Sequence, residues 1–184
     1  FNKGVTAGSM SVDGTLNVNG ATITVVGLMA VDGNVDSTHG ISAGSITLKG
    51  DLDVTGGTIT VDNALAVLAS GDMDLSNNVA LSAKTLIMNG AMQVRGGKVA
   101  TTGAATIEGT LSHALTADNT KAIDMDVGGL LHMKGTGKIT ATGKSDLRST
   151  SFYASHGGAA HTQYSSGIHG SVMNPTGLGQ RAKA

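Results

Sequence analysis

Five aspartates are the residues of this sequence best suited to chemistry, because they recur at matched places in a repeat. They are Asp36, Asp51, Asp53, Asp72 and Asp74. Stacked strands would hold these carboxylates about 5 Å apart on one exposed face, where like charges repel. A divalent cation that prefers oxygen ligands, such as Ca²⁺, would relieve that repulsion. The alternative is a solvated acidic strip, eased by salt and by nearby Lys49, and the sequence leaves both interpretations open.

The same aspartates raise the question of a glycan-cleaving enzyme. Such enzymes use paired carboxylates at defined separations, or clustered Asp beside Arg or Lys in a groove. Arg95 is the only arginine among the repeats, and aromatic residues able to stack on sugar rings make up 2% of the chain. One G-x-S-x-G match, from Gly40 to Gly44, is followed by another β repeat and not by a helix, so we interpret it as a turn. The sequence therefore predicts no catalytic site, with a carbohydrate-active β-helix enzyme as the alternative.

Composition narrows the binding partners and cofactors. The 184 residues carry a net charge of −1 with no long run of either sign, so the sequence shows no basic patch for binding nucleic acid. Cysteine is absent, which excludes disulfides and Cys-based zinc sites. No apolar run approaches the roughly 18 residues of a membrane span. We therefore expect no nucleic-acid partner, no membrane span and no cofactor other than Ca²⁺.

A repeat centred on glycine determines the expected fold. Its pattern is apolar-x-apolar-x-Gly-x-apolar-x-apolar, and the central residues are Gly14, Gly33, Gly50, Gly71, Gly90, Gly109 and, in degenerate form, Gly135. Alternation of period two predicts strands, and a second, shorter alternation such as Ile23 and Val25 lies between copies. Self-similarity at nearly constant spacing favours stacking of each copy on the next over antiparallel hairpins. We predict an all-β, parallel β-helix of about seven coils over residues 1–145, right-handed as parallel crossovers are.

The repeat also assigns faces. Apolar residues such as Leu52, Ile59 and Met92 are expected inside, while Thr58 and the five aspartates point outward. The central glycine is expected on the inward register, where it permits a bend or bulge within the strand. Methionines of the repeats, Met133 among them, are interpreted as core filler. Turns are expected at Asn19-Gly20, Thr55-Gly56-Gly57, Ser76-Asn77-Asn78 and Arg95-Gly96-Gly97.

Residues 146–184 lack the repeat and differ in composition. They contain three of the four aromatic residues, the only proline and three histidines. The aromatics are Phe152, Tyr153 and Tyr164, and the histidines are His156, His161 and His169. The histidine spacing matches no helix-based metal motif, so we interpret these as polar loop residues. We expect this segment to be a cap, an arm or a linker, with the three aromatics as assembly residues. The expected partners are the chain itself, end to end or through this segment, or flanking modules of a longer chain.

The coils over about residues 8–142 resemble the parallel β-helix repeats of long cell-surface proteins, such as filamentous haemagglutinin-type passengers. The later segment Ser155-His156-Gly157-Gly158, followed by His169-Gly170-Ser171-Val172 and Asn174-Pro175, looks like a Gly/His-rich junction of very large β-helix surface proteins. In that junction a tyrosine stands where this chain has His169. The resemblance implies a structural segment of a surface fibre, adhesin or extracellular filament, located outside the cell or at its surface. A cytoplasmic polymer resembling the bactofilins is the alternative.

Overall fold

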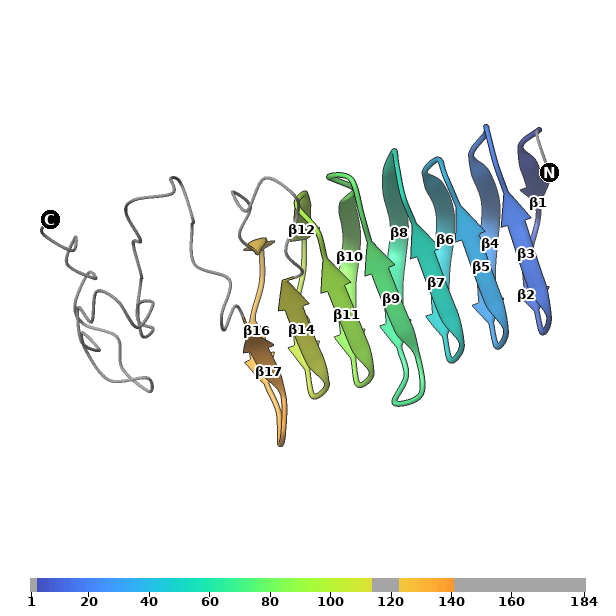
Figure 1. Cartoon of the computed structure of the whole chain (residues 1–184). Coiled ribbons are helices and arrows are strands. Elements are labelled where there is room, and N and C mark those ends of the chain that lie inside the picture. The colour runs from blue at the N-terminus through green and yellow to red at the C-terminus, as the bar shows by residue number, and fades with distance from the viewer. Residues whose placement is uncertain (1–2, 114–122, 141–184) are drawn as a thin grey trace, which may run out of the picture. The chain divides into compact units, whose positions relative to one another are not determined.

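The computed structural model describes residues 3–113 and 123–140. Over these residues the protein is an all-β parallel solenoid of about six turns, which confirms the predicted fold class. Figure 1 shows the coils side by side, with one sheet in front of the other. No helix in the described ranges is long and apolar enough to cross a membrane.

Two parallel sheets make up the solenoid, with ten strands in the first and seven in the second. The strands of the first sheet are β1 (Val5–Ala7), β2 (Met10–Val12), β4 (Ile23–Val31), β6 (Ile41–Leu48), β8 (Thr58–Val67), β10 (Ala80–Met88), β12 (Lys98–Thr101), β13 (Ala105–Ile107), β15 (Asp124–Val127) and β16 (Leu131–Met133). Those of the second are β3 (Thr15–Val18), β5 (Asn34–Ser37), β7 (Asp51–Val54), β9 (Asp72–Leu75), β11 (Ala91–Val94), β14 (Thr110–His113) and β17 (Lys138–Thr140).

Equivalent residues of successive repeats stack on one another. In the second sheet Leu52 pairs with Met73, and Met73 pairs with Met92 on the next coil. The degenerate seventh copy stacks in the same way in the first sheet, because Leu131 pairs with Ala105. This register, in which like stacks on like, distinguishes a solenoid from a sandwich of hairpins.

The repeat glycine lies at a corner between the two sheets, and our placement of it inside one strand was wrong. In the second coil β4 ends at Val31, Asp32 and Gly33 form the corner, and β5 begins at Asn34. A Cβ on Gly33 would overlap the carbonyl oxygen of Gly14 one coil earlier, so glycine alone lets successive corners stack this closely. The sequence hid the break because a two-residue corner leaves the period-two alternation in phase.

The half-repeat before each glycine is joined to the shorter alternation that precedes it. This makes β4, β6, β8 and β10 long strands of eight to ten residues. Each ladder between them contains a register shift where the two parts meet, for example between Ala43 and Ile46. The shift re-aims the second part of the strand, as a β-bulge does.

The expected turns at the other end of each coil are confirmed by backbone conformation. Gly20, Gly57 and Gly97 have φ of 92°, 77° and 90°, and Asn77 has φ of 54°. Glycine adopts these values without cost, and asparagine is the residue that tolerates them next best. The side chain of Asn77 also donates to the carbonyl of Thr55 one coil earlier, at 3.1 Å.

The core is a column of apolar side chains between the sheets, as the repeat predicts. Leu52, Ile59 and Met92 are each 0% exposed, while Thr58 points into solvent. Burying a side chain of this size contributes roughly 1.5–3 kcal/mol. Met133 does not follow this pattern. It occupies the inward register on the last described coil but is 43% exposed, because no described coil stacks beyond it.

The predicted boundary at residue 145 stays a prediction. The segment 146–184, with Phe152, Tyr153 and Tyr164, lies outside the described residues, and so do the tail histidines.

Candidate functional site

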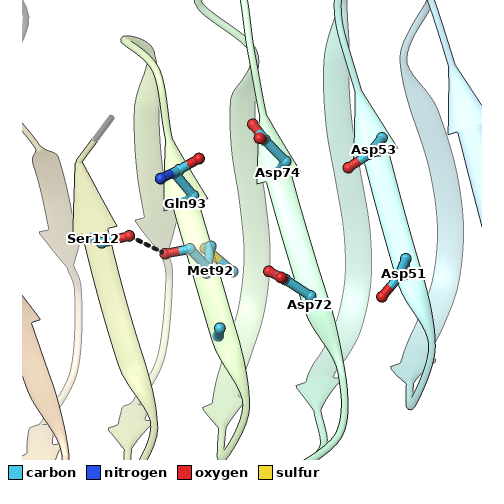
Figure 2. Close-up of a pocket in the computed structure, with 8 residues that line it drawn as sticks. Asp51, Asp53, Asp72, Asp74, Met92, Gln93 and Ser112 are labelled. Atoms are coloured by element: carbon cyan, nitrogen blue, oxygen red, sulfur yellow. Dashed lines mark hydrogen bonds between the residues drawn. The ribbon is translucent and has the colours of Figure 1, made fainter. Parts of the chain in front are cut away.

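The five aspartates form two neighbouring columns on the outer face of the second sheet. Asp36 on β5, Asp53 on β7 and Asp74 on β9 pair in register across three coils. Asp51 and Asp72 pair beside them on β7 and β9. Figure 2 shows the four side chains of β7 and β9 projecting from the same face of the sheet. The structure thus places the five aspartates in the register that the repeat predicts.

The alternation of each strand puts these carboxylates outside. In β7 the sequence Asp51-Leu52-Asp53-Val54 alternates exposed and fully buried residues. Aspartate is unfavourable in strands, but here the buried leucine and valine contribute enough burial to hold the strand in register. Because parallel strands lie about 4.8 Å apart, carboxylates in one column are close neighbours.

The acidic strip ends at β11, because the two positions in register with its columns carry neutral side chains. Ala91 stands next to Asp72, and Gln93 stands next to Asp74. The short alanine side chain leaves a hollow beside the carboxylates. This hollow has a volume of about 350 Å³, and its lining residues are Asp51, Asp53, Asp72, Asp74, Ala91, Met92, Gln93 and Ser112. Sequence reasoning missed the hollow, although the change from Asp to Ala within the column signals it.

Asp74 is the one carboxylate of the strip with a cationic partner among the described ion pairs. Arg95 Nη2 donates to Asp74 Oδ2 at 2.7 Å and to Gln93 Oε1 at 3.2 Å. Ser76 Oγ donates to Asp74 Oδ1 at 3.0 Å, so both carboxylate oxygens accept a hydrogen bond. Arg95 therefore helps to neutralise the negative charge at one end of the strip.

Lys49 does not ease the strip as we expected. Its Nζ lies 3.2 Å from Asp32 Oδ1, at the corner between the sheets. Lys49 and Asp32 are corner residues of successive coils, each lying between a strand of the first sheet and a strand of the second. The ion pair is solvent-exposed, so its contribution to stability is small.

Asp53 has the most crowded position in the strip. Partial burial raises the pKa of its carboxyl group, and the charges of Asp74, Asp36, Asp51 and Asp72 raise it further. All four neighbours are acidic, and the burial that desolvates the carboxylate acts in the same direction. The ionised form of Asp53 is therefore the form that this fold disfavours.

A metal ion on the strip would draw few ligands from the chain itself. Among residues 3–113 and 123–140, no three His, Asp or Glu side chains converge on one point as a ligand set. Calcium takes six to eight oxygen ligands, so a bound ion would keep much of its water. Calcium binding stays a prediction, and its test is given in the Discussion.

The G-x-S-x-G match lies in a strand, not in the turn that we expected. Ser42 is on the outer face of β6 and pairs with Thr60 on β8. A nucleophile elbow needs a sharp strand-to-helix turn, and β6 continues as a strand beyond Gly44.

Comparison with known proteins found no matching family model, no matching curated protein and no matching solved structure.

Proposed function

We propose that this chain is a structural β-solenoid segment of a surface fibre, adhesin or extracellular filament, and not an enzyme. The observation that carries the proposal is the continuity of the coil. Both sheets run through every described coil, and the apolar column between them continues from one coil to the next. A ladder of this kind resists local unfolding, because each inner coil is hydrogen-bonded and packed on both neighbours. Rigid length is what a fibre segment supplies.

The acidic strip supports a structural role over a catalytic one. Acid–base cleavage of a glycan needs one carboxyl that donates a proton and one carboxylate that acts as base or nucleophile, held on opposite sides of the bond. Here the carboxylates project side by side from one face of the second sheet, and Arg95 already pairs with Asp74. The strip keeps the face hydrated and charged, which discourages lateral association of coils.

The test combines location with activity. Antibodies raised against the chain would be used on native cells after fractionation, and intact cells would be treated with an external protease. We expect the chain in the surface or secreted fraction and its loss on protease treatment. Reducing-end assays on acidic polysaccharides should show no cleavage by the purified chain.

Two outcomes would overturn the proposal. A chain found inside the cell and protected from protease would favour the bactofilin-like cytoskeletal polymer. Polysaccharide cleavage that is lost on Asp53→Asn or Asp72→Asn would favour the carbohydrate-active enzyme.

A further inference from the structure

The corner glycines of the solenoid share an environment that the first coil lacks. A Cβ on Gly33, Gly50 or Gly109 would overlap the carbonyl oxygen of the corner glycine one coil earlier. Gly14 has the same place in its coil, yet a Cβ there would meet no described atom within 4 Å. Gly14 also lacks the positive φ that would call for glycine. Since glycine costs conformational entropy on folding, its presence here needs another reason.

We propose that the outer side of the first coil is a docking surface for the last described coil of a second copy of this chain, stacked head to tail. This inference rests on the proposed structural function and names the partner that extends the fibre. The first coil consists of β1, β2 and β3, and the last consists of β15, β16 and β17 (Figure 1). The two coils present three short strands in the same order and direction, so stacking would continue the parallel ladders of both sheets.

The chain already contains the corner contact that such a junction requires. The corner of the last coil, residues 134–137, has four residues instead of two. Residues 68–71 form a corner of the same length inside the stack. In both corners the amide of the fourth residue donates to the carbonyl of the first residue at 2.8 Å. The two-residue corner of Asn89 and Gly90 stacks directly on residues 68–71, and a Cβ on Gly90 would overlap two carbonyl oxygens of that corner.

The backbone hydrogen bonds of that internal contact show what the junction would form. Asn89 N and Gly90 N donate to Val67 O at 2.7 and 3.2 Å, and Ala91 N donates to Gly71 O at 3.0 Å. In the junction the amides of the first coil's corner take the donor roles.

By the same register, the amides of Asp13 and Gly14 would donate to Met133 O of the second copy. The amide of Thr15 would donate to Gly137 O. Gly14 would then lie against backbone carbonyls as the other corner glycines do, which explains why a side chain is absent there.

The charges at the two ends are complementary. In this arrangement Asp13 corresponds to Asn89. Lys134 corresponds to Leu68, the first residue of the corner on which Asn89 stacks. The two would therefore be neighbours across the junction. Within the chain, corner residues of successive coils reach one another in this way, since Lys49 and Asp32 form an ion pair at 3.2 Å.

The apolar column is also open at both ends of the described stack. Leu131, Met133 and Ile139 occupy inward register positions, yet they are 41%, 43% and 42% exposed. At the other end Met10 and Leu16 are only partly buried and border a hollow of about 330 Å³. Stacking one end on the other would bury both sets, which is the main favourable term in association.

Sedimentation of the full chain across a concentration series tests the proposal. The wild-type mass should rise with concentration. Gly14→Val should sediment as a monomer at every concentration, because its side chain would block the incoming carbonyls. Thr60→Val introduces the same side chain at an exposed position in mid-stack and should associate as the wild type does. At concentrations too low for association, circular dichroism melts of the two variants should match, since a Cβ on Gly14 would meet no described atom within 4 Å.

A charge exchange identifies the partner surface. Asp13→Lys and Lys134→Asp should each weaken association by on the order of tenfold, because each puts like charges at the junction. A mixture of the two single variants, or both changes in one chain, should restore it.

Three results would overturn the inference. The first is a wild type that stays monomeric at all concentrations. The second is association that survives Gly14→Val. The third is a charge-exchanged pair that fails to recover. None of these bears on the cellular location or on polysaccharide cleavage, so the proposed function stands or falls separately.

Discussion

Removing the charge of Asp53 should stabilise the protein at neutral pH. Asp53 lies between Asp36 and Asp74 in one column. Neighbouring strands of a sheet are about 4.8 Å apart, so the three carboxylates are close to one another. Two unit charges 4 Å apart in water repel by about 1 kcal/mol, and physiological salt weakens this further. Arg95 offsets the repulsion from Asp74. The relief on Asp53→Asn is therefore about 0.5–1 kcal/mol, equal to a rise in melting temperature of about 1–4 °C.

The pH dependence gives this prediction its sign. The pKa of Asp53 is raised above its ordinary value of 3.8, so the folded state holds the proton more tightly than the unfolded chain. The stability that this group contributes is fully present below pH 3.8 and is lost as pH rises through the raised pKa. The advantage of Asp53→Asn should therefore be seen at pH 7 and vanish at low pH.

Thermal melts followed by circular dichroism, at pH 7 and pH 3 and at low and high salt, measure the effect. Asp62→Asn is the matched control, because Asp62 is an exposed aspartate of β8 outside the strip. It should shift the melt far less than Asp53→Asn does. A destabilised Asp53→Asn at pH 7, or a gain that persists unchanged at pH 3, would refute the account of repulsion within the strip.

The remaining predictions use the same melts. Met92→Asp should cost about 3–5 kcal/mol and unfold the stack, because an unpaired charge would enter the core, whereas Thr58→Asp should be tolerated; equal melts for both would contradict the assigned faces. If the strip binds calcium, millimolar Ca²⁺ should raise the melting temperature and the double change Asp53→Asn with Asp74→Asn should abolish that rise; a melt indifferent to calcium and EDTA would leave a solvated strip. Gly109→Ala should destabilise by about 1–3 kcal/mol, since its Cβ would overlap a carbonyl of the coil before, and a neutral effect would argue against close corner stacking.

The sequence by itself determined the stacking and the faces. Alternation of period two tells which side chains are buried, so the sequence alone places Leu52 and Ile59 inside and Thr58 outside, as the structure has them. Repetition tells which residues are neighbours across coils, since like stacks on like. The register of Asp36, Asp53 and Asp74 followed from these two facts alone.

Only the tertiary structure decided where each coil turns. A corner that leaves the alternation in phase is invisible in the pattern, so Gly33 could be taken for a residue inside a strand. Because Lys49 and Asp32 both lie at such corners, on successive coils, they form an ion pair that the alternation does not reveal. The hollow beside Ala91 and the ion pair between Arg95 and Asp74 likewise depend on contacts between side chains of different coils. Sequence periodicity fixes the order and the face of residues, but distances between coils arise only once the chain has closed its turns.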